Sequence, residues 1–242
     1  MIPYESALVR KLNTFNLLGP GELAILAKLE SRPHRVAAGT ELVQEHQAGH
    51  HAYILQQGWA CAYKLLEDGK RQVVDFPIAG DILGLRSVLL RTSDHSFAAL
   101  TNLVVAKVSG HQMIDSLMRL PKLSAAILWA ASREEAMVVE HLVSVGRRGA
   151  LQRLAHFLLE LGERLQLAGL GSEDSFACPL SQYHLADAIG LTAIHVNRLL
   201  RDLRDQKLVT FRAGVVRFHD RKELRRLAVW HGGYLDAKLL PC

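Results

Sequence analysis

Side chains suited to hydrogen bonding with DNA bases gather in one stretch of the chain, residues 180–212. Arginine carries a two-pronged guanidinium group that fits the O6 and N7 acceptors of guanine in the major groove. The apolar spacing of this stretch predicts a helix from about Thr192 to Gln206 with a polar, basic outward face. That face carries His195, Asn197, Arg198, Arg201 and Arg204. We interpret it as a DNA-reading surface; a solvated face on a plain helical subdomain is the alternative.

Two helices joined by a turn are predicted to hold this face in place. Ala186 is small enough for a helix crossing, Gly190 suits a turn with positive φ, and Val196 would pack back onto the first helix. Ser181 and Thr192 are each placed to cap the start of a helix. The other expected buried residues are Leu185, Ile189, Leu191, Leu199 and Leu200. These signals favour a helix-turn-helix whose second helix enters the major groove of DNA.

A two-stranded ribbon is predicted directly after the second helix. The segment LVTFR is followed by Ala213-Gly214 and then by VVRFH, which is a hairpin pattern. Residues 181–228 also hold ten lysines or arginines against five acidic residues, so they account for the net charge of +5 of the whole chain. A local basic excess suits a surface that binds phosphates. The stretch therefore describes a winged helix-turn-helix that binds DNA.

The composition indicates a globular protein with two small domains. The chain has 242 residues, of which 49% are hydrophobic and 22% are charged. Its three cysteines, Cys61, Cys178 and Cys242, are widely spaced, which argues against a disulfide framework and suits the cytoplasm. We expect neither a signal peptide nor a membrane span, because no apolar run approaches the necessary length. A cytoplasmic location is the resulting expectation.

The order of the predicted elements gives an α+β fold in three parts. Helices over residues 1–31 and short strands over 34–108 predict an N-terminal antiparallel β-roll or jelly-roll barrel, with a hairpin turn at Asp68-Gly69. A single long helix is predicted over 111–146. The predicted domains are a sensory barrel with its N-terminal helices (1–110), a dimerisation helix (111–146) and the winged helix-turn-helix domain (147–242).

The predicted dimerisation helix carries a heptad-like series in which steps of four and three residues alternate. The series is Leu120, Ser124, Ile127, Ala131, Glu134, Val138, His141 and Val145, and the stripe is broadened by Leu123, Leu128, Met137 and Leu142. Such spacing is typical of a seam between two paired helices. Glu134 and His141 lie on this seam, and we interpret them as wet edge positions, with a pH-sensitive pair as the alternative.

This order of parts resembles the Crp/Fnr family of bacterial transcription regulators over nearly the whole chain. The segment LADAIGLTAIHVNRLLRDLRDQKLV resembles the recognition unit of the family, and GDILGLRSVLL resembles its nucleotide-pocket segment. The resemblance implies a homodimer that binds palindromic double-stranded DNA with one recognition helix per half-site, and RNA polymerase as a further partner. It also implies that an effector bound or sensed in the barrel resets the dimer helices.

The resemblance assigns DNA contacts residue by residue. Arg198 falls on the guanine-reading arginine of the family, and Ser181, Gln182 and Thr192 fall on positions that contact phosphates or fix helix ends. The predicted DNA-binding set is Ser181, Gln182, Thr192, Ala193, Ile194, His195, Asn197 and Arg198. Much of the family has a glutamate that accepts from cytosine N4 where this chain has Ile194, which cannot accept but can touch a thymine methyl. We therefore expect a half-site that differs from the usual one.

The resemblance also assigns a possible effector pocket, formed by Gly84, Leu85, Arg86, His95 and Ser96. Members that bind cyclic AMP have a glutamate where this chain has Leu85, and an arginine-serine pair where it has His95-Ser96. Charge-assisted hydrogen bonds, which are roughly twice as strong as neutral ones, are thereby lost, although Arg86 is placed to substitute. We predict that cyclic AMP is not the effector. A regulator with a cyclic nucleotide or another small ligand in the barrel is the alternative.

The remaining reactive side chains do not support an enzyme, a metal site or a cofactor. An iron–sulfur sensor of this family needs an N-terminal cysteine cluster, and the first 60 residues contain no cysteine. His46, His50 and His51 are interpreted as polar surface rather than as metal or haem ligands. Cys178 is interpreted as an idle or buried thiol, with a redox switch as the alternative. An interaction protein that docks an acidic partner on its basic domain is the other rival.

Overall fold

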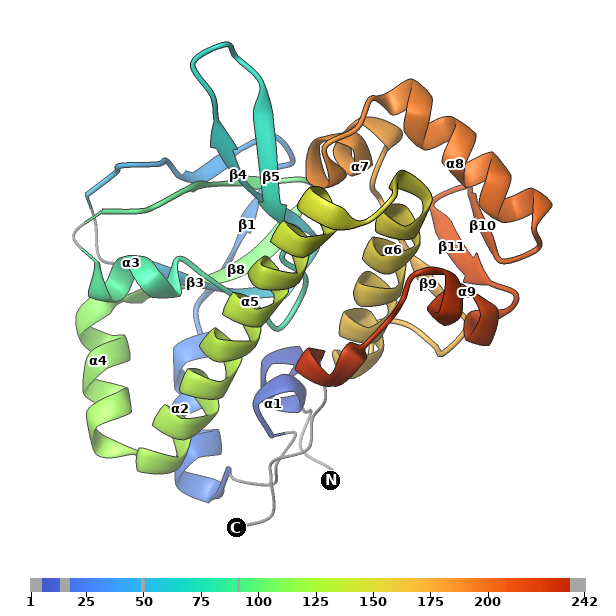
Figure 1. Ribbon diagram of the computed structural model, residues 1–242. Helices are drawn as coiled ribbons and strands as arrows, with labels where there is room; N and C mark the ends of the chain where they lie inside the picture. The colour runs from blue at the N-terminus through green and yellow to red at the C-terminus, as the bar shows by residue number, and fades with distance from the viewer. Residues whose placement is uncertain (1–5, 14–17, 49–50, 91, 236–242) are drawn as a thin grey trace. The chain divides into compact units, whose positions relative to one another are not determined.

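The structure, a computed structural model, describes residues 6–13, 18–48, 51–90 and 92–235 (Figure 1). These residues form two compact units, the first ending at Ser132 and the second beginning at Arg133. The boundary lies inside the long helix α5 (Pro121–Arg147). No helix in the described ranges is long and apolar enough to cross a membrane.

Two four-stranded antiparallel sheets, with strand orders β1-β8-β3-β6 and β2-β7-β4-β5, form the centre of the first unit. The strands are β1 (Pro33–Val36), β2 (Glu41–Val43), β3 (His51–Gln57), β4 (Ala60–Leu65), β5 (Arg71–Asp75), β6 (Ile82–Leu83), β7 (Ser96–Ala99) and β8 (Leu103–Ser109). Alternate residues of both sheets, among them Leu55, Phe97 and Val105, share one buried core. Gly69, at φ 80°, turns the β4–β5 hairpin where Asp68-Gly69 predicts it. The predicted antiparallel β-roll is thus confirmed.

Helices cover the other face of the sheet that contains β3 and β8. They are α1 (Ala7–Leu12), α2 (Pro20–Glu30), α3 (Leu85–Leu89), α4 (Gly110–Arg119) and the first part of α5. Leu8, Leu26 and Leu123 of these helices pack with Ile54 and Val108 of the strands in a second core. Because residues 54 and 55 of β3 point to opposite faces, one strand contributes to both cores.

The helical stretch predicted over residues 111–146 is wrong in one respect, because it consists of two helices, α4 and α5. The chain leaves helical geometry at Leu120, where φ is −127° and ψ is 88°. The residue before a proline is disfavoured in the α region, and proline lacks an amide hydrogen, so Pro121 ends the first helix and begins the second. The long helix is therefore α5, with 27 residues.

Helix α6 (Ala150–Leu167) is the centre of the second unit, and its Leu154, Leu158 and Leu161 are fully buried. Around it lie α7 (Gln182–Ile189), α8 (Ala193–Asp205), α9 (Arg221–Leu227), the 3-10 helix η2 (Gly232–Leu235), and a sheet of β9 (Ser175–Ala177), β10 (Val209–Arg212) and β11 (Val215–Phe218) in the order β10-β11-β9. A Cβ at Gly162 would lie 2.9 Å from the Phe218 ring, so this glycine lets α6 approach the sheet. The predicted winged helix-turn-helix is confirmed.

The exposed apolar stripe of α5 includes only part of the predicted heptad series. Ile127, a member of that series, is buried in the core, and His141 hydrogen-bonds to a residue of α6. Val138 and Val145 of the series are exposed, and the most exposed apolar residues beside them are Leu128, Val139 and Leu142, at 68%, 52% and 72%. Heptad spacing identifies two neighbouring stripes equally well, and only packing decides which one the protein covers with its own core.

Candidate nucleic-acid interface

Local hydrogen bonds determine where α7 and α8 begin. The Ser181 hydroxyl accepts a hydrogen bond from the His184 amide at 3.3 Å, and the Thr192 hydroxyl accepts from the His195 amide at 3.2 Å. Between the helices Gly190 adopts φ 66° and ψ 43°, which only glycine adopts at little cost. Both predicted caps and the predicted turn are confirmed. The start of α8 is therefore set by the motif itself.

The inner side of the motif is packed as predicted. Leu185, Ala186, Ile189, Val196 and Leu199 are buried, and Leu191 and Leu200 are half-buried. Val196 is fully buried in spite of lying on the first turn of α8. Because this side of α8 is buried against the unit's core, the opposite side faces solvent.

Four residues on the solvent side of α8 form what we call the recognition face: Ile194, Asn197, Arg198 and Arg201. Residues three and four positions apart are neighbours on a helix surface. All four side chains are exposed, that of Ile194 to 78%. Within the described ranges, the side chains of Asn197, Arg198 and Arg201 make no hydrogen bond or ion pair with the rest of the chain. Their donors are available to a partner.

The other residues predicted to bind DNA lie at the first turns of α7 and α8. Gln182 and Thr192 are exposed, and Ser181, Ala193 and His195 are half-buried. Tyr183, next to Gln182, is 73% exposed, although an aromatic residue at helical spacing is usually expected in a core. The motif thus presents both helix starts to solvent, with an aromatic ring that the sequence analysis missed.

The ribbon after α8 is a tight hairpin. Ala213 and Gly214 occupy its turn with φ 49° and 71°, as a two-residue type I′ turn requires. Val216 and Phe218 point into the core, whereas Arg212 and Arg217 are exposed. The hairpin therefore presents two cations to solvent, in keeping with a wing that contacts phosphates.

Arg153 of α6 joins the carbonyl ends of two other helices. Its guanidinium donates to the Ile189 carbonyl at the end of α7 at 2.6 Å, and to the Val145 and Arg148 carbonyls at the end of α5 at 3.0 and 3.2 Å. A cation is favourable at a helix C-terminus because the last carbonyls carry partial negative charge. Arg153 thereby positions the helix-turn-helix against the end of the long helix. Sequence analysis missed it because its partners are backbone atoms.

Glu160 of α6 is a fully buried carboxylate that receives hydrogen bonds from two other elements. His141 Nε2 lies 2.7 Å from one carboxylate oxygen, and the Tyr234 hydroxyl donates to the other at 2.8 Å. Burial acts to raise the pKa of Glu160, but His141, Arg164 and the hydrogen bonds outweigh it and lower the pKa to about 2. An ionised carboxylate therefore holds α5, α6 and η2 together.

His156 lies one turn from Glu160 on α6 and is 1% exposed. Its ring lies 4.6 Å from the Trp230 ring and is parallel to the Tyr234 ring at 6.4 Å, measured between centroids. Burial, followed by the charge of Arg148, lowers the pKa of His156 to about 4. The histidine is therefore neutral near pH 7, unlike the charged carboxylate beside it.

The structure supports the interpretation of Cys178 as a buried thiol. The residue is 1% exposed, and burial raises its pKa to about 12. Because the thiolate is the form that reacts with oxidants, a redox switch at Cys178 is not supported. In the part of the chain that the structure describes, no three His, Cys, Asp or Glu residues are placed to hold a metal ion. His50, one of the three neighbouring histidines, lies outside that part.

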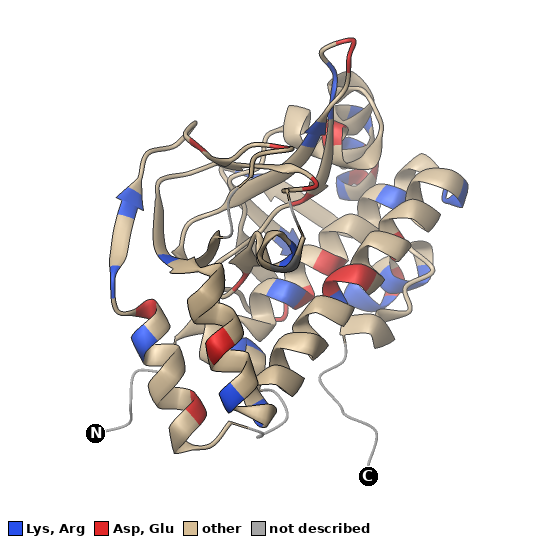
Figure 2. Cartoon of the chain, turned by 90° about the vertical axis from the view of Figure 1, so that its left-hand side faces the viewer, with Lys and Arg blue, Asp and Glu red and all other residues tan. Residues whose placement is uncertain are grey.

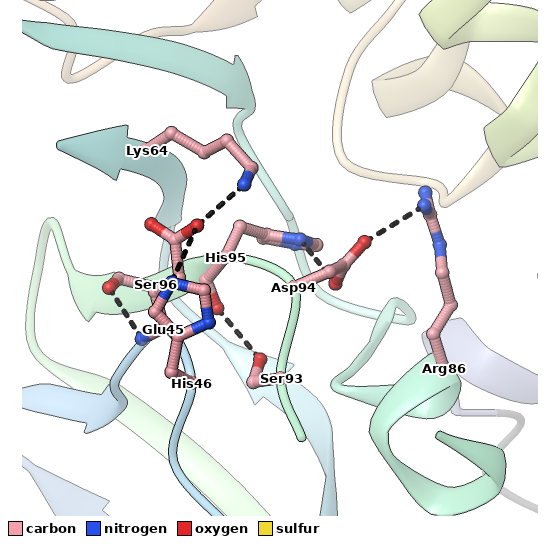
Figure 3. Close-up of polar contacts among 8 residues, drawn as sticks. All are labelled: Glu45, His46, Lys64, Arg86, Ser93, Asp94, His95 and Ser96. Carbon is pink, nitrogen blue, oxygen red and sulfur yellow. Dashed lines mark hydrogen bonds and ion pairs between the residues drawn. The ribbon is translucent and has the colours of Figure 1, made fainter. Parts of the chain in front are cut away.

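The predicted effector pocket contains a set of side chains that bind one another (Figure 3). Arg86 Nη1 lies 3.2 Å from one oxygen of Asp94, and His95 Nδ1 lies 2.7 Å from the other. Burial lowers the pKa of His95 and outweighs the attraction of Asp94. Arg86, the residue placed to replace the lost phosphate ligand, is thus already paired with Asp94.

The serine of the predicted pocket is also engaged. The Ser96 hydroxyl accepts a hydrogen bond from the Glu45 amide at 2.9 Å, and the Glu45 carboxylate lies 2.5 Å from Lys64 Nζ. Gly84, at φ 72°, begins α3, and Leu85 follows it as a half-buried apolar residue. We call Arg86, Asp94, His95, Ser96, Glu45 and Lys64 the barrel cluster.

Comparisons with known proteins agree with both parts of this description. Residues 33–119 match the family described as the cyclic nucleotide-binding domain, and residues 152–227 match the Crp-like helix-turn-helix domain. The solved structure of FixK2 from Bradyrhizobium japonicum has a TM-score of 0.73 and 26% identity, covering 81% of this chain and 96% of that one.

Two regulators are similar to this chain over most of their length. The nitrogen fixation regulation protein FixK of Bradyrhizobium diazoefficiens is 32% identical over 212 residues, 87% of each protein. The transcriptional activatory protein AadR of Rhodopseudomonas palustris is 30% identical over 223 residues, 91% of this chain and 90% of the relative. With this likeness and a confirmed winged helix-turn-helix, the chain belongs to the Crp/Fnr family of DNA-binding transcription regulators.

Proposed function

We propose that the protein regulates transcription as a homodimer on a palindromic operator, reading each half-site with the recognition face of one α8. The observation that carries the proposal is that Asn197, Arg198 and Arg201 are exposed and have no side-chain partner among the described residues, on a helix whose start is fixed by a cap. Arg198 binds O6 and N7 of a guanine, and Asn197 is suited to an adenine, since these pairs match in the major groove.

The surrounding residues position the helix on the DNA backbone. Ser181, Gln182 and Thr192 at the helix starts bring hydroxyl, amide and backbone N–H donors towards phosphates, because a helix N-terminus attracts anions. Ala193 and His195 flank the base-reading residues at the edge of the groove. Arg212 and Arg217 of the wing add contacts that depend on salt and not on sequence.

The dimer forms through the exposed apolar stripe of α5. Leu128, Val139 and Leu142 are large apolar side chains that are more than half exposed in the single chain, and they share one side of the helix. Pairing two copies of this stripe removes it from water. Two-fold symmetry then places the two recognition helices about 34 Å apart, one helical turn of DNA.

We propose that the barrel does not bind cyclic AMP. A cyclic phosphate would have to break the contact of Arg86 with Asp94, and Leu85 offers no acceptor to a ribose hydroxyl. The alternative, a cyclic nucleotide or other small ligand in the barrel, predicts binding heat in a calorimetric titration with cyclic AMP or cyclic GMP. We further propose a cytoplasmic protein with RNA polymerase as a partner, without enzymatic activity or cofactor.

Selection of random duplex DNA by the purified protein without effector tests the proposal. We expect enrichment of a palindrome with a guanine in each half-site. Leu142→Glu places a charge in the exposed apolar stripe of α5. This variant should be a monomer in sedimentation experiments and should no longer enrich a palindromic sequence. Leu170→Glu, at an exposed loop residue after α6, is the matched control. A dimeric wild-type protein that enriches no sequence would contradict the proposal and favour an acidic protein partner.

A further inference from the structure

We propose that Ile194 binds the C5-methyl group of a pyrimidine in the major groove, so that the base preference at one position of each half-site depends on that methyl. The inference rests on the proposed role of the recognition face and adds a base contact that is apolar. It assigns a specificity-determining function to the residue of the face that has no hydrogen-bonding group.

The exposure of Ile194 is at odds with the rest of α8. Val196, Leu199 and Leu203 of this helix are buried and at most 7% exposed. Ile194, in contrast, is 78% exposed. A β-branched side chain is a mediocre helix former, so its place on a solvent-facing turn does not stabilise the helix. Neither core packing nor helix stability therefore explains why an isoleucine occupies this position.

Its position places it where a base edge would lie. Ile194 lies on the first turn of α8, and the N-terminal residues of a recognition helix are the ones that contact bases. Arg198 is four residues further along the same face, about 6 Å along the helix axis. Base pairs follow one another every 3.4 Å or so along the duplex axis. The methyl group is thus expected within about two base pairs of the guanine bound by Arg198.

The chemistry of the major groove then selects the base. Thymine presents a methyl group and one acceptor there, whereas cytosine presents an amino donor and guanine two acceptors. An isoleucine side chain cannot satisfy a donor or acceptor that it covers, and an unsatisfied polar group costs free energy. Contact with the thymine methyl removes apolar surface of both groups from water. A 5-methylcytosine carries the same methyl, so it should bind better than cytosine at this position.

The test uses the operator that the wild-type protein selects. Each thymine in the operator is replaced by deoxyuridine, which lacks only the methyl group, and affinity is measured for the wild type and for Ile194→Ala. We expect one symmetric position per half-site at which deoxyuridine weakens the wild type about fourfold, the effect of one methyl group, and leaves the alanine variant unchanged. Alanine is the better helix former, so the variant keeps its fold.

Two further variants make the assignment specific. Leu170→Ala shortens another exposed apolar side chain of the second unit, 41% exposed and outside α8, and should keep the deoxyuridine effect. Ile194→Glu supplies an acceptor for cytosine N4, so selection with this variant should replace thymine by cytosine at the same position. In the wild type, 5-methylcytosine should exceed cytosine in affinity there.

The outcomes separate this inference from the proposal on which it rests. If deoxyuridine has equal effects on the wild type and on Ile194→Ala at every position, the methyl contact is overturned. Arg198→Ala, tested on the same DNA, shows independently whether the recognition face reads a guanine. If neither variant changes the selected sequence, both the face and the methyl contact are overturned.

Discussion

The recognition face and the barrel cluster carry similar side chains in opposite states. In the barrel cluster, Arg86 binds Asp94, and Glu45 binds Lys64. On the recognition face, Arg198 and Asn197 are exposed and make no such contact within the described residues. Charged residues of both signs are spread over the helices of the chain (Figure 2), so composition alone does not mark the binding surface.

Whether polar side chains already bind one another is therefore a better guide to a ligand site than their residue type. A ligand of the barrel cluster must first break internal hydrogen bonds, and their loss is subtracted from its affinity. DNA that meets the recognition face displaces only water and counterions from it. The family resemblance assigns a site to both regions, whereas the side-chain contacts support only the second.

Glu160 is a fully buried carboxylate with two internal partners, so its replacement should lower the free energy of unfolding more than any other change proposed for the chain. Glu160→Leu leaves His141 and the Tyr234 hydroxyl without their shared partner, and breaking a buried pair on one side costs about 3–5 kcal/mol. We expect the free energy of unfolding of the second unit to fall by that amount in urea denaturation. Glu223→Leu breaks the exposed pair with Arg226 and should leave the free energy of unfolding nearly unchanged. Equal losses would contradict the comparison.

The buried His156 should make stability depend on pH. Its pKa is lowered to about 4 in the folded chain, while the unfolded chain takes up the proton near its ordinary value of 6.5. The unfolded state therefore binds more protons between these values, and stability falls as pH decreases from 6.5 to 4, by at most about 1.4 kcal/mol per pH unit. The groups that face the ring are Glu140, His141, Arg148, Glu160, Trp230 and Tyr234.

Denaturation of the wild type and of His156→Phe between pH 6.5 and 5 isolates this contribution. The phenylalanine ring keeps the contacts with Trp230 and Tyr234 but cannot be protonated. Above pH 5 the ordinary carboxylates are still ionised, so the difference in slope belongs to His156. Parallel pH profiles for the two proteins would show that the buried ring is not held neutral.

Arg198 is the residue of the recognition face that is expected to contribute most to base recognition. Arg198→Ala should weaken operator binding by about 1–3 kcal/mol and abolish the preference at one guanine of each half-site, because the bidentate contact is lost. Stability should not change, since the side chain has no internal partner within the described ranges. Arg204→Ala removes the same charge from the end of α8 and should weaken all DNA alike. Fluorescence anisotropy distinguishes these results when duplexes with guanine are compared with duplexes that carry 7-deazaguanine, which lacks the N7 acceptor, at that position.

How much the sequence predicts depends on how local the determining interaction is. The caps at Ser181 and Thr192 and the turn at Gly190 involve atoms at most five residues apart, and they are correctly predicted. The contacts of Arg153 with Ile189 and of Glu160 with Tyr234 join residues 36 and 74 positions apart, so no local pattern reveals them.

The errors have the same origin. The break at Pro121 follows from a local preference, but the heptad series that begins at Leu120 runs across this proline and favours one helix. The choice between Ile127 and Leu128 as the exposed position of α5 depends on which side the first unit's core covers. In the barrel, the replacement of the arginine by His95 is readable from the sequence, whereas its pairing and that of Arg86 with Asp94 follow only from the fold.

A substitution at Asp94 should have only a small effect on stability, and it separates two reasons why the barrel does not bind cyclic AMP. Asp94→Asn removes the charge that Arg86 and His95 share, and because the pair is partly exposed the free energy of unfolding should fall by less than about 1 kcal/mol. Operator affinity should stay at the wild-type value. Arg86 is then released, but Leu85 still supplies no carboxylate, so calorimetry should detect no cyclic AMP binding. Asp68→Asn, which breaks an exposed pair with Lys70 at the hairpin turn, is the control. Binding heat with Asp94→Asn alone would mean that pairing, and not the missing carboxylate, keeps a nucleotide out of the barrel.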